Sequence, residues 1–253
     1  MRGKTLVFLI IAVFLITVLS VGFTSLKDKG EQENPFKAAN YLYIWTFEIG
    51  KGTILSEAIE ETSNWVKVIR ETKENKSVRL FLHHTGPELA LYIFQEPKSW
   101  QSIIRCEEKM MAAMPDLMNK PIWWSGHSDN VVAEIPLGLE KSQTMQKKTK
   151  SEGTNFLWIC ENEIGPGQTI QEAIEDHMEW AKAFWKTGEF KDIRLYSHYV
   201  SPRNALYFVM EPKNWQSFET GWAKGMEALP NFMKEPLKYG KHTDNILTEI
   251  IVK

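Results

Sequence analysis

The hydrophobic positions of this chain follow two different periods. Between residues 41 and 47 an aromatic side chain recurs at every second position, which predicts a β-strand that Gly50 and Gly52 bring to an end. The stretch 54–74 has apolar residues at helical spacing and acidic residues near its beginning, which predicts an amphipathic helix. A strand followed by a helix therefore opens the patterned part of the chain.

The next segments predict three more strands and one more helix. We expect strands over 78–84 and 90–95, and a helix that has Pro97 in its first turn and runs to about Met118. A final strand is expected over 130–135. The resulting order, strand–helix–strand–strand–helix–strand, is the ferredoxin-like βαββαβ pattern of α+β proteins.

This whole pattern occurs twice. Residues 40–138 align without a gap with residues 155–253, at a constant offset of 115 positions, and about 40 of the 99 aligned positions are identical. A repeat of this length corresponds to a small domain and is too long for a solenoid unit. Two similar domains in one chain usually take the places of the two subunits of a homodimer, related by a pseudo-twofold axis.

The duplicated βαββαβ pattern resembles the dimeric α/β-barrel superfamily, which includes cofactor-free antibiotic-biosynthesis monooxygenases, haem-degrading monooxygenases and chlorite dismutase-like haem proteins. The resemblance covers nearly all of residues 40–253 and rests on element order, domain length and duplication, without the motif of any one subfamily. It implies that the two four-stranded sheets close into one intramolecular barrel, which leaves few exposed strand edges. It also implies ligands that lie between the sheet and the helices of each half.

The first residues are typical of a membrane-targeting segment. Arg2 and Lys4 precede an apolar run that ends at Phe23 and is long enough to cross roughly 30 Å of hydrocarbon. We expect 1–23 to be an uncleaved transmembrane anchor, and the basic residues before the run predict that the repeats lie outside the cytoplasm, periplasmic or extracellular. A cleaved signal peptide, which would give a secreted protein, is the alternative.

Polar segments separate the anchor and the repeats. Residues 24–39 are expected to be a tether, and residues 139–154, rich in Lys, Gln, Ser and Thr, a linker. The formal net charge is −2 and no basic stripe is visible, which argues against nucleic acid as a partner. Cys106 and Cys160 occupy non-equivalent positions of the repeat, and the sequence does not decide whether they pair.

Polar and aromatic side chains share one face of the predicted sheet. In the second strand, Arg79, Phe81 and His83 alternate with Val78 and Leu80 and therefore point to the opposite side. With their equivalents and neighbours, the candidate ligand-binding residues on this face are Arg79, Arg194, Phe81, Tyr196, His83, His198, Tyr92, Tyr207, Glu134 and Glu249. A histidine suits general-base catalysis and an arginine suits holding an anion or enolate, so the two Arg–His pairs are the candidate catalytic residues.

A structural role for this set is the alternative. Arg79 and Glu134 would then form an ion pair, and His83 would bond a backbone carbonyl. The alternation of the strand does not say whether this face points into the barrel or toward the helices.

An H-x-D-N motif begins at His127 and recurs at His242, directly before the last strand of each repeat. The aspartate would orient the histidine for base catalysis, ligand binding or haem ligation. The alternative is a turn in which Asp and Asn bond backbone groups. His177 has no histidine at its equivalent position, and we expect it on the solvated side of a helix.

Trp123 and Trp124 are adjacent and occur only in the first repeat. Exposed tryptophans in a loop would form a contact with a protein partner or a membrane interface, or would cover the mouth of a pocket.

These features favour an exported, membrane-tethered tandem barrel that binds a small apolar or aromatic ligand. If the protein is catalytic, the resemblance implies monooxygenase-like or haem-linked oxidation. A non-enzymatic ligand-binding or sensory module and an interaction module of a membrane complex are the alternatives. The sequence has no Cys-x-x-Cys, phosphate loop or His-Glu-x-x-His motif, so we predict no metal and no cofactor from its residues, and haem enters only through the resemblance.

Overall fold

The computed structural model describes residues 40–85, 89–116, 123–139, 156–200, 204–229 and 239–253. The predicted anchor, the tether and all of the linker after residue 139 lie outside the described residues. Among the helices within the described ranges, none is both long and apolar enough to cross a membrane.

Both repeats have the predicted order of elements. The first consists of β1 (Tyr41–Ile49), α2 (Leu55–Glu71), β2 (Asn75–Thr85), β3 (Ala90–Pro97), α3 (Trp100–Ala113) and β4 (Trp124–Ile135). The second consists of β5 (Phe156–Ile164), α4 (Ile170–Lys186), β6 (Phe190–Val200), β7 (Ala205–Pro212), α5 (Trp215–Glu227) and β8 (Tyr239–Ile250).

The second helix of each repeat begins later than the sequence suggested. Pro97 is the last residue of β3, and α3 begins after Ser99, whose hydroxyl accepts a hydrogen bond from the Ser102 N–H. Asn214 caps α5 in the same way, with its Oδ1 bonded to the Ser217 N–H. The prediction that Pro97 lies in the first turn was wrong because a serine two residues later offers the side-chain acceptor that a helix start needs.

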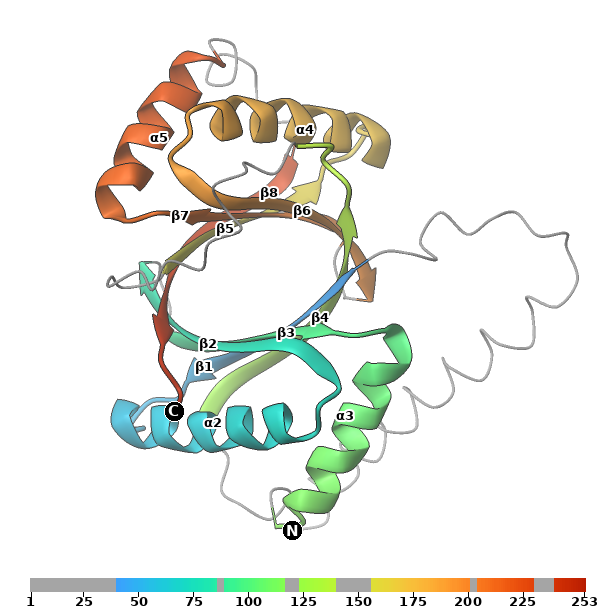
Figure 1. Ribbon diagram of the computed structural model, residues 1–253, viewed down its shortest axis with the longest axis vertical. Helices are drawn as coiled ribbons and strands as arrows, with labels where there is room; N and C mark the ends of the chain where they lie inside the picture. Colours follow the sequence, from blue (N-terminus) through green and yellow to red (C-terminus); the bar gives the residue numbers. More distant parts are fainter. Residues whose placement is uncertain (1–39, 86–88, 117–122, 140–155, 201–203, 230–238) are drawn as a thin grey trace, which may run out of the picture. The chain divides into compact units, whose positions relative to one another are not determined.

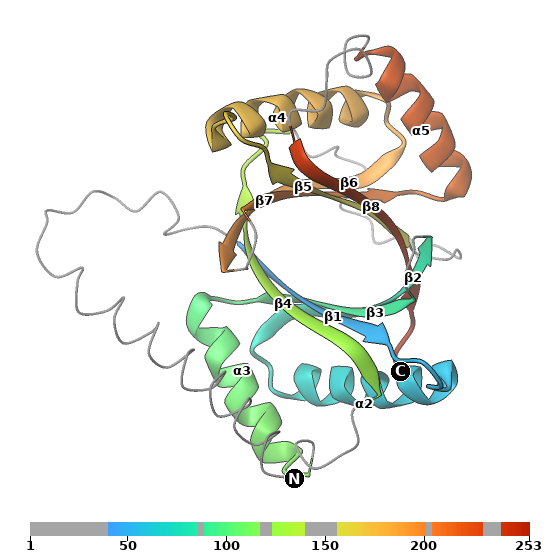
Figure 2. The same cartoon turned by 180° about the vertical axis from the view of Figure 1, so that it is seen from behind.

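The eight strands form one closed barrel in the order β1-β3-β2-β8-β5-β7-β6-β4 (Figures 1 and 2). Each repeat supplies one four-stranded sheet, and the two sheets join where β2 pairs with β8 and β4 pairs with β6. All neighbouring strands are antiparallel, so equivalent strands of the two repeats run in the same direction along the barrel. The pseudo-twofold axis therefore coincides with the barrel axis, and equivalent residues lie at the same barrel end.

The last strand of each repeat is longer than predicted. β4 begins at Trp124, well before Asn130, because residues 124–129 pair with the second half of β1, where Phe47 lies opposite His127. The H-x-D-N motif therefore lies within a strand, and its histidine and aspartate point to the same side of the sheet.

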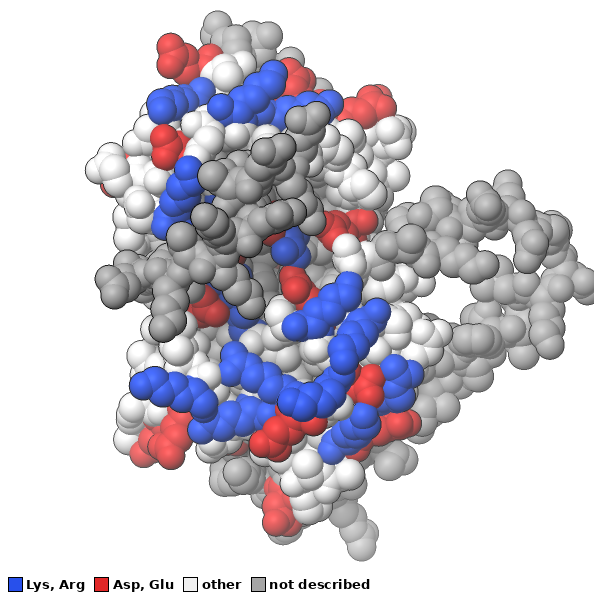
Figure 3. All heavy atoms as spheres, viewed as in Figure 1, with Lys and Arg blue, Asp and Glu red and all other residues white. Residues whose placement is uncertain are grey.

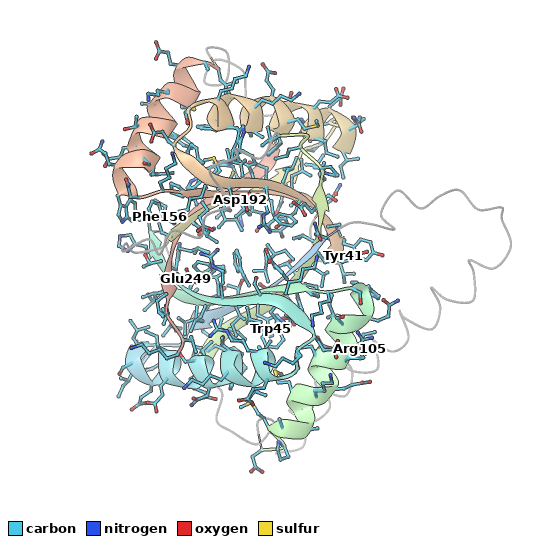
Figure 4. The ribbon with its side chains drawn as sticks, in the orientation of Figure 1. Tyr41, Trp45, Arg105, Phe156, Asp192 and Glu249 are labelled. Atoms are coloured by element: carbon cyan, nitrogen blue, oxygen red, sulfur yellow. The ribbon has the colours of Figure 1, made fainter. Side chains whose placement is uncertain are left out.

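Apolar side chains pack in three layers. Two clusters lie between a sheet and its two helices, one in each repeat, and a third fills the barrel. Val78 and Leu80 belong to the outer cluster of the first repeat, whereas Phe81 belongs to the barrel cluster. In Figure 4, Trp45 lies between the first sheet and α2. The face that carries Arg79, Phe81 and His83 therefore points into the barrel, which the sequence had left open.

Candidate functional site

One end of the barrel interior carries a network of ion pairs. The Arg79 guanidinium donates from Nε and Nη2 to the two carboxylate oxygens of Glu249, at 3.0 and 2.9 Å, and from Nη1 to Glu211 at 2.9 Å. Its Cζ lies 4.9 Å from the centre of the Phe81 ring. Burial alone would lower the pKa of Arg79, but the bonds to Glu249 and Glu211 outweigh it and raise that pKa.

The equivalent arginine also bridges to the other repeat, but it shares only one of the two equivalent partners. Arg194 donates to Glu96 of the other repeat and to Asp192, and its Nη1 lies 3.3 Å from the Tyr196 hydroxyl. The carboxylate of Glu134, which the sequence offered as an ion-pair partner for Arg79, accepts a bond from the Asn40 side chain at 2.7 Å. The ion-pair prediction was correct in kind but wrong in its partner, because both arginines bridge to the other repeat.

The space left between these charges is small. Residues from both repeats line a cavity of about 50 Å³ at this barrel end, among them Arg79, Arg194, Glu96, Asp192 and Glu211. Pockets for small organic molecules usually have volumes of about 300 Å³ or more. The arrangement therefore holds the two sheets together, and ligand binding by these arginines stays a prediction.

The interior histidines lie farther along the same strands. His83 is buried, and its ring centre is 6.1 Å from that of Tyr92. The Nε2 of His198 is buried without a hydrogen-bond partner among the described residues, and the Tyr207 hydroxyl lies 3.5 Å from the Asn130 side chain. Four residues span about 13 Å of strand, and the fully buried Phe81 ring lies between Arg79 and His83. The arginine and the histidine of the first predicted catalytic pair thus lie on one wall of the barrel with an aromatic ring between them, and a joint role in catalysis stays a prediction.

The repeated His-x-Asp pairs point outward, toward the helices. In the first repeat, the His127 ring stacks on Phe47 with ring centres 4.5 Å apart, and its Nε2 lies 3.2 Å from Asp129. The side chain that packs against this histidine from the sheet is thus an aromatic ring.

In the second repeat, polar side chains contact the equivalent histidine in place of the aromatic ring. His242 Nδ1 lies 2.5 Å from Asn162 Oδ1 and 3.4 Å from Cys160 Sγ, and His242 Nε2 lies 2.6 Å from Asp244 Oδ2. Behind them, Asn162 Nδ2 lies 2.8 Å from His177 Nε2. These five residues form what we call the polar cluster of the second repeat.

His177 lies at the buried end of this cluster, and this position corrects the sequence-based prediction. It was expected on the solvated side of its helix, but its side chain is fully buried and its Nδ1 lies 2.7 Å from the Ala173 carbonyl oxygen. Burial lowers the pKa of His177 to about 4, so the ring is neutral at neutral pH.

The hydrogen-bond partners fix the direction of each bond. The Ala173 carbonyl can only accept, so His177 Nδ1 carries the proton and its Nε2 accepts from the Asn162 amide. The Asn162 oxygen then accepts from His242 Nδ1. With the ring proton on Nδ1, His242 Nε2 is an acceptor, and it faces the Asp244 carboxylate, which is also an acceptor. Two acceptors at this distance need a cation between them, either a proton or a metal ion.

Cys160, on β5, is the remaining member of the cluster. Its thiol is almost fully buried, 3.1 Å from Asn162 Nδ2 and 4.0 Å from His242 Nε2. Burial first, and then the nearby Asp244 carboxylate, raise the pKa of the thiol well above its usual range. Cys160 and Cys106 are both free thiols, so the disulfide that the sequence left open is absent.

Cys160, Asn162 and His177 were not among the predicted site residues. Residues that are identical in the two repeats do not include these three, which differ from their counterparts Trp45, Phe47 and Thr62. The informative signal was that three positions change together: a tryptophan and a phenylalanine of one copy become cysteine and asparagine in the other, and a threonine becomes histidine.

The adjacent tryptophans of the first repeat pack inward. Trp123 and Trp124 are partly buried, and their rings lie 5.9 and 5.3 Å from that of Phe47. Trp124 also lies 5.7 Å from Trp65. They extend the aromatic core under His127, and a partner contact through them stays a prediction.

Charges of both signs occur on the surface seen down the barrel. In Figure 3, basic side chains gather over the lower half, which is the first repeat, with acidic side chains between them. Some of these charges are paired, since both Arg105 and Lys109 of α3 bond Glu74. In Figure 4, Asp192 and Glu249 belong to opposite parts of the barrel wall.

Haem does not fit the described residues. Its place in a dimeric α/β barrel would be the space between sheet and helices, which aromatic rings fill. These rings are Trp45, Phe47 and Trp65 in the first repeat and Trp158, Phe184 and Phe208 in the second, all at most 8% exposed.

Comparison with known proteins supports the fold. No protein-family profile and no curated protein sequence matches the chain. A protein of Fusobacterium nucleatum subsp. nucleatum named "Putative monooxygenase" matches with a TM-score of 0.61 and 12% identity, over 85% of this chain and 94% of that chain. A mutant chlorite dismutase from Candidatus Nitrospira defluvii matches with a TM-score of 0.54 and 11% identity, over 84% and 92%. At such identities the similarity establishes that this chain has the dimeric α/β-barrel fold.

Proposed function

We propose that this protein is an oxidoreductase that binds a small molecule, and that its functional site lies in the second repeat of the tandem barrel, around His242. One observation carries the proposal. Both repeats have a partly exposed His-x-Asp pair on their last strand, β4 in the first and β8 in the second. Only the pair of the second repeat lies over a buried polar cluster. A hydrogen-bonded chain of buried polar groups is costly to keep in a core, so its presence in one repeat favours a role beyond packing.

The chemistry that the pair suits is proton transfer. Asn162 orients the His242 ring, and the proton between His242 and Asp244 is accessible because their side chains are 33% and 44% exposed. Once the shared proton has passed to water, the pair can accept the hydroxyl proton of a small hydroxylated aromatic molecule bound beside it. The shared fold with proteins named as monooxygenases favours oxidation by oxygen as the reaction that follows, by analogy.

Oxygen consumption by matched variants tests this function. The full-length chain, purified in a mild detergent, would be assayed with an oxygen electrode against a panel of hydroxylated aromatic compounds, with 1,4-dihydroxynaphthalene as the first probe. His242→Ala should lower kcat/KM by about 100-fold or more, since general acid–base catalysis contributes at least that much. His127→Ala, the same change in the other repeat, is the control and should stay near wild type.

A third variant tests the barrel interior in the same assay. The double change His83→Gln and His198→Gln removes the two interior histidines that the sequence favoured, and it should leave the activity unchanged. Loss of activity in that double variant, or equal loss in His127→Ala and His242→Ala, would contradict a single site in the second repeat. Retention of a co-purified small molecule without oxygen uptake would favour the non-enzymatic binding module.

We also propose that the barrel lies outside the cytoplasm, tethered through residues 1–23. The support is the apolar run itself and the two basic residues, Arg2 and Lys4, that precede it.

A further inference from the structure

The geometry points to a metal site in the second repeat: we propose that Cys160, His242 and Asp244 bind a divalent ion of the zinc class. A sulfur, an imidazole nitrogen and a carboxylate oxygen of these residues all lie within 4.8 Å of one another. This donor set, with one soft sulfur ligand, suits Zn²⁺ and Co²⁺ and does not suit Mg²⁺ or Ca²⁺, which prefer oxygen ligands alone.

The hydrogen-bond directions leave room for a cation where the three donors meet. Because His242 Nδ1 donates to Asn162, the lone pair of Nε2 faces the Asp244 carboxylate across 2.6 Å. Cys160 Sγ lies 4.0 Å from the same Nε2. An ion at about 2.0 Å from nitrogen and 2.3 Å from sulfur would set these two atoms roughly 3.5 Å apart. The small adjustments needed fall on His242 and Asp244, whose side chains are partly exposed.

The residues behind the ligands are those that a metal site requires. A metal-bound histidine usually donates its other ring N–H to an oxygen acceptor, and Asn162 Oδ1 is that acceptor here. The Asn162 amide also points an N–H at the Cys160 sulfur, 3.1 Å away, which would stabilise a metal-bound thiolate. His177 holds Asn162 in this orientation, and both are fully buried.

The first repeat shows the same scaffold without the site. His127 and Asp129 are kept, but Trp45 and Phe47 stand where the second repeat has Cys160 and Asn162. The metal site would therefore be present once per chain, and the first repeat provides a control for every ligand.

Three protein ligands leave one tetrahedral position open, which is the pattern of catalytic rather than structural zinc. The exposed edges of His242 and Asp244 would let water or a substrate oxygen reach that position. In this respect the inference rests on the proposed function, because the ion would take the place of the proton between His242 and Asp244 and would hold the ionised hydroxyl group of the same small molecule. Metal binding itself requires no reaction and can be measured alone.

The test uses Co²⁺ as the probe, because a thiolate bound to cobalt gives a ligand-to-metal charge-transfer band that hydroxyl and carboxylate ligands do not give. The full-length chain, treated with a chelator and dialysed, would be titrated with Co²⁺ and then with competing Zn²⁺. We expect the band to rise to a plateau at one ion per chain and to disappear as Zn²⁺ replaces cobalt.

Variants assign the ligands. Cys160→Ala should abolish the band, and His242→Gln should lower cobalt affinity by at least about tenfold, whereas Cys106→Ala and His127→Gln should behave as wild type. Asn162→Leu should keep the band and weaken binding about 10- to 100-fold, as expected of a residue that positions a ligand. Circular dichroism of each variant shows whether it has folded, and His242→Gln, a surface change, remains informative if Cys160→Ala does not fold.

The outcomes separate this inference from the proposed function. No charge-transfer band in the wild type, or an equal band in Cys160→Ala, overturns the metal site even if His242→Ala abolishes oxygen uptake. A cobalt band that needs Cys160 and His242 supports the metal site even if none of the aromatic compounds is oxidised.

Discussion

The buried imidazole of His177 makes the stability of the second repeat depend on pH in a way that can be calculated. Its pKa falls from 6.5 to about 4 on folding because the ring is taken out of water. Between these two values the unfolded chain binds a proton that the folded chain does not, so the free energy of unfolding decreases as the pH falls. Each pKa unit corresponds to about 1.36 kcal/mol, so the full effect is about 3 kcal/mol.

The variant His177→Thr removes this effect with a side chain that the fold already accepts. Thr62 holds the equivalent position of α2, fully buried, and its hydroxyl donates to the Ala58 carbonyl as His177 Nδ1 donates to that of Ala173. The smaller side chain leaves one N–H of the buried Asn162 amide without its acceptor, so the variant should be less stable at pH 7. The loss on acidification should nevertheless be smaller than in wild type by about 3 kcal/mol.

Urea unfolding followed by circular dichroism at several pH values between 7 and 4 measures this difference. The exposed His84→Thr is the control for loss of one imidazole, and it should follow the wild-type curve. Parallel curves for wild type and His177→Thr would refute the argument, because they would mean that His177 takes up its proton in the folded state as readily as in the unfolded chain.

Three further predictions follow from the barrel. Arg79→Met leaves the Glu249 carboxylate without its arginine and leaves Glu211 only Lys191, 3.8 Å away, and should lower the free energy of unfolding by about 2–3 kcal/mol. Arg105→Met, at a more exposed ion pair, should cost clearly less; equal costs in urea unfolding would contradict the interior network. Residues 34–140 alone lose the β2–β8 and β4–β6 pairings and should aggregate or form a homodimer in size-exclusion chromatography, so a stable monomer would count against the shared barrel. Protease added outside intact cells or spheroplasts should cleave within the repeats, and their protection would reverse the orientation drawn from Arg2 and Lys4.

Sequence periodicity was sufficient for the order of strands and helices because each of these signals is local. Every second residue from Tyr41 to Phe47 is aromatic, the helices show apolar stripes, and a gapless duplication predicted the second sheet. That the two sheets close into one barrel was implied by the family resemblance. The partner of Arg79 was not predictable in this way. It depends on the register between β2 and β8, which are about 170 residues apart, and no local pattern specifies that register.

His177 shows a different limit. It was expected on the solvated side of its helix, yet the buried residues of α4 are Ala173, His177, Ala181 and Phe184, which follow helical spacing. The other three are apolar, so the stripe is visible in the sequence, but helical periodicity alone does not show that a polar residue within it is buried. The polar cluster could not be derived from the sequence because its members come from β5, α4 and β8 and meet only in the folded chain.

The pairing of β2 with β8 and of β4 with β6 inside one chain also sets how the barrel responds to dilution. A barrel made from two separate subunits dissociates when the protein is scarce, because its assembly depends on the concentration of the partner. Here each half meets the other at an effective concentration that the covalent connection fixes, whatever the number of molecules in the cell. The closed barrel can therefore persist at a few copies per cell, where an unlinked pair of equal affinity would fall apart.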